Sequence, residues 1–263
     1  MIQFNCLTFG KKSNPPILFL HGFMGSSADW DSICNALAEK FYCIALDLPG
    51  HGQTTTSSNE DFTMEHCSSE IINFLHERKI IKPHLLGYSM GGRIALFLSV
   101  YYGEKFSKIL LESASPGLKT ESERTDRQIK DSLLARRLQM QPFKQFVENW
   151  YEMPLFETVQ KDKKSYDRMI RSRLQNDPKL LSLSLTYIGS GSQPPLWEQL
   201  KDIKNSTLLL TGSDDAKFSS IAADMHSRNR TMQHEIIDDC GHNIHFENKQ
   251  IFIETISEFL NNE

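Results

Sequence analysis

The sequence of 263 residues lacks any long run of basic side chains and has a formal charge of −4 at pH 7. General nucleic-acid-binding proteins carry basic tracts or patches, so this charge balance argues against that class. No uncharged apolar run approaches the ~18 residues of a membrane-spanning helix. Residues 1–5 also lack the basic and apolar regions of a secretory signal. We therefore expect a soluble, cytoplasmic protein that binds neither nucleic acid nor membrane and acts on a small molecule.

Cysteine is sparse, scattered and odd in number, and no C-x-x-C spacing occurs. Such a pattern is typical neither of a disulfide framework nor of a zinc site. The cysteines therefore indicate reduced thiols in a reducing compartment. They are Cys6, Cys34, Cys43, Cys67 and Cys240. The sequence also contains no internal repeat and no low-complexity tract.

A serine flanked by glycines stands between an apolar run and a helical pattern. Residues 87–92 read G-Y-S-M-G-G, follow the apolar residues 84–86 and lead into the helical residues 93–98. The two flanking glycines permit the tight strand-to-helix turn of a nucleophile elbow, in which the serine projects from a strained backbone. Ser89 is therefore a candidate catalytic residue, and the amide of Met90 faces an oxygen held beside it. A glycine-rich turn without catalytic purpose is the alternative for this segment alone.

Apolar runs alternate with helical patterns along most of the chain. The predicted strands cover residues 2–9, 17–20, 42–46, 84–86, 107–112, 206–211 and 232–237. The predicted helices cover residues 30–39, 64–79, 93–101, 217–226 and 246–260. Continuous apolar runs are expected where a strand is covered on both faces. The alternation predicts an α/β fold, with a mostly parallel central sheet flanked by helices on both faces and the first strand at its edge.

The alternation stops near residue 115, and only helical patterns follow. Residues 116–200 contain fourteen basic and eleven acidic side chains, a net charge of +3, which leaves −7 for the rest of the chain. We interpret residues 116–204 as a helical cap inserted into a core formed by residues 1–115 and 205–263. A solvated helix surface explains most of these charges. A cationic cap over an acidic body also favours a ligand with carboxylates or phosphates.

A serine, an aspartate and a histidine follow predicted strands in the chain order of an α/β-hydrolase triad. A serine hydroxyl needs an imidazole to take its proton, and the imidazole needs a carboxylate to fix its tautomer. Ser89 and His242 fill two of these roles, and of the adjacent aspartates we prefer Asp215, with Asp214 as a helix cap or turn residue. His245 competes with His242, but a histidine directly after a glycine at a strand end is better placed. A metal site at this His-x-x-His pair lacks further ligands at suitable spacing.

A second glycine-bearing loop, residues 21–26, directly follows the predicted strand at 17–20. Loops at the carboxyl ends of parallel strands are where α/β folds bind ligands. The backbone amide of Phe23 is therefore a second candidate oxyanion donor beside that of Met90. We interpret His21 as a residue that braces this loop rather than as a catalytic group.

The cap carries motifs that are more distinctive than the elbow, because caps diverge freely among hydrolase-like enzymes. They are residues 112–118, Glu123–Arg124 with Arg127 and Asp131, residues 146–151 before 154–156, residues 173–176 and residues 191–197. With these motifs the chain resembles the α/β-hydrolase superfamily over nearly its whole length. More narrowly, it resembles the 2-succinyl-6-hydroxy-2,4-cyclohexadiene-1-carboxylate synthase (MenH) family of menaquinone or phylloquinone biosynthesis.

The resemblance implies a lyase rather than a hydrolase. The family removes a ring proton next to a succinyl ketone and expels pyruvate from 2-succinyl-5-enolpyruvyl-6-hydroxy-3-cyclohexene-1-carboxylate. In this chain Asp215 and His242 would make Ser89 a general base, and the amides of Phe23 and Met90 would hold the ketone oxygen. The resemblance implies no metal and no redox cofactor.

The resemblance also implies a substrate with several carboxylates, which gives the cationic cap a purpose. The side chains that match the family's substrate-binding positions are Tyr88, Arg93, Arg124, Trp150, Phe156 and Arg173. Two other functions stay open from the residues themselves. A serine hydrolase of small esters or carbon–carbon bonds uses the same triad, and a non-catalytic ligand-binding module can share the fold.

Overall fold

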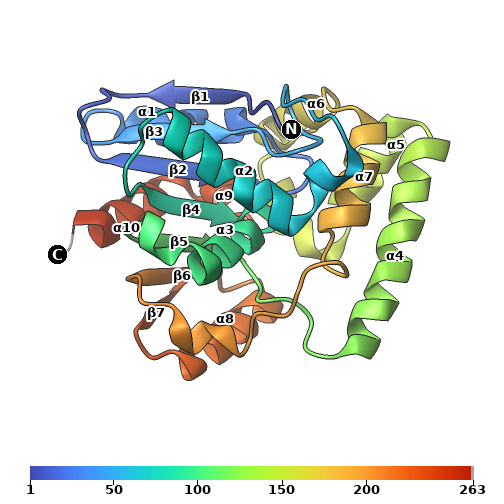
Figure 1. Cartoon of the computed structure of the whole chain (residues 1–263). Coiled ribbons are helices and arrows are strands. Elements are labelled where there is room, and N and C mark those ends of the chain that lie inside the picture. Colours follow the sequence, from blue (N-terminus) through green and yellow to red (C-terminus); the bar gives the residue numbers. More distant parts are fainter. Residues whose placement is uncertain (262–263) are drawn as a thin grey trace.

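The apolar runs of the sequence form one seven-stranded sheet in the structure, a computed structural model that describes residues 1–261 (Figure 1). The strand order is β1-β3-β2-β4-β5-β6-β7. The strands are β1 (Cys6–Phe9), β2 (Pro16–Leu20), β3 (Tyr42–Leu46), β4 (His84–Tyr88), β5 (Ile109–Glu112), β6 (Thr207–Gly212) and β7 (Met232–Ile237). Edge strand β1 pairs antiparallel with β3, and the other pairings are parallel, which confirms the predicted fold class.

The central strands are buried along their whole length, as their continuous apolar sequences predict. Every residue of β3, β4, β5 and β6 is buried, whereas β7 at the far edge is buried only at its first and last residues. In the parallel register Gly87 of β4 lies opposite Leu20 of β2 and Leu111 of β5. The loops that follow these strands therefore leave the sheet at the same edge.

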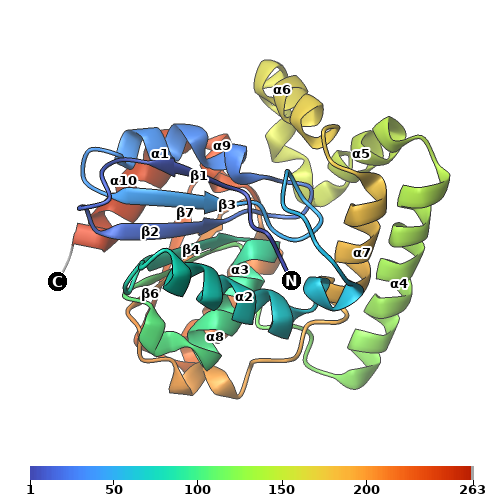
Figure 2. The ribbon, with the colours of Figure 1, turned by 45° about the horizontal axis from the view of Figure 1, so that its top comes forward.

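Helices cover both faces of the sheet, and each face has its own apolar core (Figure 2). Helices α2 (Met64–Glu77), α3 (Met90–Tyr101) and α8 (Ala216–Arg228) pack on one face. Helices α1 (Asp31–Leu37) and α10 (Lys249–Asn261) pack on the other. This arrangement follows from helices whose apolar stripe must be buried against the sheet.

The segment between β5 and β6 is helical throughout its regular parts and contains no strand. Its longer helices are α4 (Glu121–Met140), α5 (Phe143–Tyr151), α6 (Lys163–Arg173) and α7 (Pro178–Ile188). They share a third apolar core that includes Leu138, Phe146, Val147 and Leu181. Figures 1 and 2 show these helices gathered beyond one end of the sheet, in the region where we predict the cap.

The predicted helix over residues 246–260 is interrupted in the structure. It is divided into α9 (Ile244–Glu247) and α10 by Asn248, whose backbone is not helical at φ −139° and ψ 77°. The Asn248 side chain accepts a hydrogen bond from the Ile251 amide at 3.2 Å, so this residue caps the second helix. An asparagine that competes for backbone donors in this way ends one helix and starts the next.

Among residues 1–261, the structure has no helix that combines the length and the apolar character needed to cross a membrane.

Candidate active site

Ser89 occupies a strained turn between β4 and α3. Its φ of 49° and ψ of −104° lie outside the helical and extended regions that most residues adopt. A Cβ atom at Gly87 would collide with the carbonyl of Gly91, and one at Gly91 would collide with the carbonyl of Leu20. The Ser89 amide donates to the carbonyl of Glu112 at 2.9 Å. The turn therefore has the geometry of a nucleophile elbow, with glycine required on both sides of the serine.

Three loops bring a hydroxyl, an imidazole and a carboxylate into one hydrogen-bonded row. His242 Nε2 lies 3.0 Å from Ser89 Oγ, and His242 Nδ1 lies 2.7 Å from Asp215 Oδ2. His242 and Asp215 are 1% and 6% exposed, so this row is shielded from bulk water. With a proton on Nδ1 donated to Asp215, Nε2 is the basic nitrogen that faces the serine.

The structure also separates the two adjacent aspartates. Asp214 is exposed, and its Oδ2 lies 3.3 Å from Nζ of Lys161. Of the two roles suggested for Asp214, that of a turn residue is confirmed, since Asp214 lies in the turn after β6 and Asp215 is the N-cap of α8. The second oxygen of Asp215, Oδ1, accepts the Phe218 amide at 3.2 Å.

His245, the other candidate histidine, is turned away from the serine. Its Nδ1 lies 2.7 Å from Glu112 Oε2, and its ring stacks on Trp30 with 4.3 Å between the ring centroids. Since His242 and His245 bind different carboxylates, they do not converge on one point. Within residues 1–261, no group of three or more His, Cys, Asp or Glu side chains is placed to hold a metal ion.

The backbone amides of Phe23 and Met90 belong to residues that line the cavity beside Ser89. Met90 is the first residue of α3, where an amide has no acceptor inside the helix. No hydrogen bond among residues 1–261 engages either amide. Both amides are thus free to donate to an oxygen atom of a ligand.

His21 braces the loop after β2, as we interpret it from the sequence. Its Nδ1 donates to the carbonyl of Gly22 at 2.7 Å, and its Nε2 accepts the Leu48 amide at 2.9 Å. Burial lowers the pKa of this imidazole below its ordinary value. A neutral ring that satisfies both neighbours holds the 21–26 loop against the turn after β3.

A cavity of about 680 Å³ lies over Ser89, between the cap helices and the edge of the sheet. Among the predicted binding residues, Tyr88, Arg93, Trp150, Phe156 and Arg173 line it. Its cationic lining residues are Arg93, Lys119, Arg127, Lys130, Arg173 and Lys217. Among residues 1–261 the acidic residues that line it are two, Asp29 and Glu123, so the cavity lining has an excess of positive charge.

Two of the lining arginines, Arg173, which is buried, and Arg93, which is partly buried, already hold protein partners. Arg93 Nη1 donates to the carbonyl of Ile188 at 2.8 Å, and burial together with nearby Arg127 lowers the pKa of Arg93 to about 10. Arg173 Nη1 lies 2.6 Å from Asp29 Oδ1, and its Nε donates to the Tyr151 hydroxyl at 2.9 Å. Burial opposes the charge of Arg173, but these two partners outweigh it and raise the pKa.

Arg124, the remaining predicted binding residue, does not line the cavity. Its Nη1 lies 3.5 Å from the carbonyl of Leu118. The cavity side of α4 consists of positions 123, 127, 130 and 134, which recur at helical spacing. Arg124 lies about 100° around the helix from position 123. The structure therefore brings Arg127, and not Arg124, to the cavity, and the binding role of Arg124 stays a prediction. Their spacing puts these four positions on one side of the helix, but the sequence does not say that this side faces the cavity.

Comparisons with known proteins agree with this geometry. The family model of the alpha/beta hydrolase fold matches residues 15–249. A Bacillus subtilis (strain 168) protein, provisionally named 2-succinyl-6-hydroxy-2,4-cyclohexadiene-1-carboxylate synthase, is 35% identical over 95% of this chain and 92% of its own length. The synthase of that name from Enterobacter sp. (strain 638) is 30% identical over 95% of this chain and 93% of its own. The structure of MenH from S. aureus has a TM-score of 0.93 and 31% identity, covering 98% of this chain and 97% of that one.

Proposed function

Because this chain belongs to the alpha/beta hydrolase fold family and, within it, to the 2-succinyl-6-hydroxy-2,4-cyclohexadiene-1-carboxylate synthases, we propose that it is a carbon–oxygen lyase that releases pyruvate. Its substrate is 2-succinyl-5-enolpyruvyl-6-hydroxy-3-cyclohexene-1-carboxylate, an intermediate of menaquinone and phylloquinone biosynthesis. The observation that carries the proposal is the row of Ser89, His242 and Asp215 at the floor of a cationic cavity.

In the proposed reaction Ser89 acts as a general base. Its Oγ takes the ring proton next to the succinyl ketone, while His242 Nε2 takes the hydroxyl proton and Asp215 stabilises the resulting imidazolium. The C–H electrons pass to the ketone oxygen and return to form the diene as the C–O bond to the enolpyruvyl group breaks. The released enolate gains a proton to become pyruvate. Proton transfer by a positioned base contributes about 10²–10⁴-fold to the rate.

The amides of Phe23 and Met90 supply the oxyanion hole in this proposal. Negative charge develops on the ketone oxygen when the ring proton leaves. Neither amide has another acceptor within residues 1–261, so both can donate to this oxygen. Such a donor stabilises the transition state by roughly 3 kcal/mol in acyl-transfer enzymes.

The cationic lining binds the carboxylates of the substrate. Arg93, Arg127 and Arg173 have further N–H groups beyond those used in their protein contacts, since a guanidinium carries five. Tyr88, Trp150 and Phe156 provide the apolar walls against which the ring packs. Five free cysteines fit the reducing cytoplasm in which we place the reaction.

A coupled assay of pyruvate release by the purified protein tests the proposal. We expect turnover by the wild-type protein and its loss in Ser89→Ala and His242→Ala, with unchanged thermal unfolding. Asp214→Asn is the matched control, because Asp214 is exposed and adjacent to Asp215 but faces Lys161; it should retain wild-type turnover. Hydrolysis of small esters without pyruvate release would instead assign the same triad to a serine hydrolase.

A further inference from the structure

The loop that carries His242 is bound by a carboxylate from the residue that ends α9. Glu247 Oε2 accepts the Gly241 amide at 2.8 Å, and Glu247 Oε1 accepts the Asn243 amide at 3.1 Å. These two amides stand immediately before and after His242 in the chain. One carboxylate therefore fixes the backbone on both sides of the imidazole that faces Ser89.

A second carboxylate binds the same loop from the sheet. Glu112, the last residue of β5, is 1% exposed. Its Oε1 accepts the His245 amide at 3.1 Å and its Oε2 lies 2.7 Å from His245 Nδ1. The carbonyl of Glu112 accepts the Ser89 amide at 2.9 Å. A single residue thus holds the serine turn through its backbone and the histidine loop through its side chain.

The His245 ring also contacts Tyr88, which lines the cavity. It stacks on Trp30 on one side, and the ring of Tyr88 meets it edge-on with 4.8 Å between the centroids. Tyr88 in turn lies 5.5 Å from the His242 ring. Movement of His245 would therefore disturb both Tyr88 and the segment next to His242.

We infer that Glu112 and Glu247 are positioning residues that set the contact between His242 and Ser89. Neither lines the cavity, so neither touches the substrate. Together they bind four donors on residues 241–245. The inference rests on the proposed function, in which the 3.0 Å contact between Ser89 Oγ and His242 Nε2 carries the proton transfer.

Loss of either carboxylate should lower kcat and leave KM nearly unchanged. Misplacement of a catalytic group by about 1 Å can cost about 10²-fold in rate. For Glu247→Ala and Glu112→Ala we expect kcat to fall about 10–100-fold, with KM within about twofold of wild type. Because Glu112 is buried, its alanine variant can fail to fold. Glu247 is only partly buried, and Glu247→Ala then decides the question.

The conservative variants give a sharper distinction. In Glu112→Gln the amide can donate to His245 Nδ1 if the ring changes tautomer, so both contacts survive and kcat should stay within about threefold of wild type. In Glu247→Gln both partners are backbone amides, which can only donate hydrogen bonds. The NH2 group of the glutamine therefore cannot bind the amide that Glu247 bound with its second oxygen. One contact is lost, and kcat should fall about tenfold.

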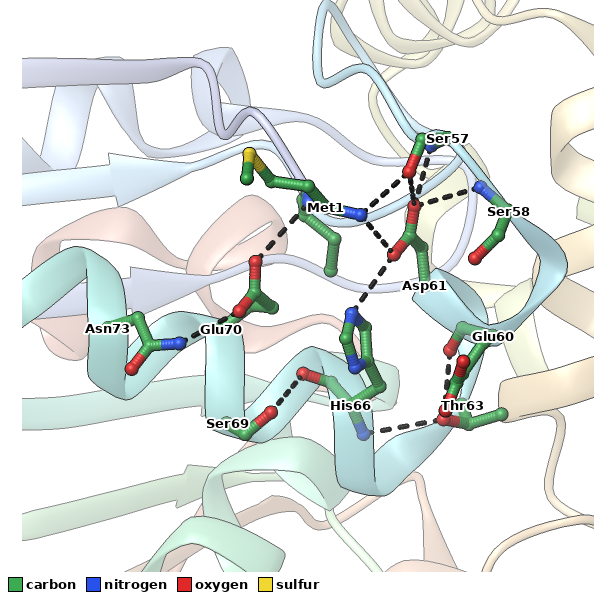
Figure 3. A network of polar contacts seen from close by, with 11 residues as sticks. Met1, Ser57, Ser58, Glu60, Asp61, Thr63, His66, Ser69, Glu70 and Asn73 are labelled. Atoms are coloured by element: carbon green, nitrogen blue, oxygen red, sulfur yellow. Dashed lines mark hydrogen bonds and ion pairs between the residues drawn. The ribbon is translucent and has the colours of Figure 1, made fainter.

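Asp61→Asn is the matched control, because Asp61 is a buried carboxylate that also binds backbone amides and a histidine (Figure 3). It does not line the cavity. The Asp61→Asn variant should be less stable than the wild-type protein and have the same kcat. Crystal structures add a readout that needs no substrate: in Glu247→Ala, His242 Nε2 should lie beyond about 3.5 Å from Ser89 Oγ.

Wild-type kcat in folded Glu247→Ala, with the 3.0 Å contact kept, would overturn the inference alone. An inactive wild-type protein would overturn the proposed function, and the crystallographic distance would still decide the role of the two glutamates.

Discussion

Asp215 shows how one side chain can join a catalytic row to a rigid element. Its Oδ2 holds His242, while its Oδ1 accepts the Phe218 amide and so caps α8. An N-cap of this kind stabilises a helix by about 1 kcal/mol. Here it also fixes the carboxylate in the orientation that the imidazole requires, which exposed Asp214 cannot provide.

Arg127 gives the first prediction at the residue scale. If it binds a substrate carboxylate, Arg127→Gln removes a hydrogen bond between charged groups, which contributes about 1.5–3 kcal/mol. We expect KM to rise roughly 10–100-fold with a smaller change in kcat, measured by pyruvate release.

Arg124→Gln is the control for this prediction, since both residues belong to α4 and only Arg127 lines the cavity. Its KM should stay close to the wild-type value. A larger rise of KM in Arg124→Gln than in Arg127→Gln would restore the assignment made from the sequence.

At the scale of elements, a polar network joins the first residues of the chain to the start of α2 (Figure 3). The Asp61 carboxylate accepts the amides of Ser57 and Ser58 at 2.6 and 3.0 Å. It also lies 3.0 Å from the Met1 ammonium and 3.0 Å from His66 Nε2. Burial favours the protonated acid, but these donors outweigh it and lower the pKa of Asp61 to about 2.

Asp61→Asn should therefore destabilise the protein in a pH-dependent way. At pH 6 we expect a loss of about 1–3 kcal/mol in the free energy of unfolding, because buried donors lose their acceptor. A carboxyl with a lowered pKa stabilises the fold above its unfolded pKa of 3.8 and loses this effect as the pH falls towards 2.

Urea unfolding of both proteins at several pH values measures the effect. The stability difference between wild type and Asp61→Asn should be constant between about pH 5 and 6 and narrow between pH 4 and about 2. A difference that widens as the acid is protonated would contradict the role assigned to this carboxylate.

At the scale of the whole molecule, the cavity lies between cap and sheet, and polar contacts hold the two together. Arg173 at the end of α6 pairs with Asp29 in the loop after β2. Three residues later, Asn176 donates to the carbonyl of Met24 at 2.8 Å and accepts the Gly52 amide at 3.0 Å. These contacts fix the helices between β5 and β6 over the segments that follow β2 and β3, the first of which carries Phe23.

Substitutions in the pair of Arg173 and Asp29 test protein stability and substrate binding separately. Arg173→Gln leaves Asp29 unpaired and should lower the free energy of unfolding by about 3–5 kcal/mol, as for other buried pairs that lose one partner. It should also raise KM. The double variant Asp29→Asn with Arg173→Gln should recover part of the stability, since the two side-chain amides can bind each other. Its KM should stay raised, because the guanidinium is still missing.

Urea unfolding and pyruvate-release kinetics on the same preparations check this expectation. Asp29→Asn alone, which keeps the guanidinium, serves as the control for KM. Recovery of the wild-type KM in the double variant would assign Arg173 a purely structural role.

Local patterns in the sequence were sufficient for the fold. The strands at 42–46 and 232–237 have the predicted bounds, and at 42–46 the continuous apolar residues between turns leave few other conformations. The elbow at Ser89 was equally predictable, since only glycine fits on both sides of it. Asn248, which divides the last predicted helix, was not, because a single side-chain cap is weak against the helical spacing around it.

The sequence by itself determined the alternation of strands and helices, the serine turn, and the order in which serine, acid and histidine follow their strands. Tertiary structure decided which side of α4 faces the cavity, and thereby that Arg127 rather than Arg124 lines it. It also decided that Glu112 and Glu247 bind one loop from two elements. The physical reason is range: a turn or a strand depends on neighbours in the chain, whereas these contacts depend on how separately formed elements pack.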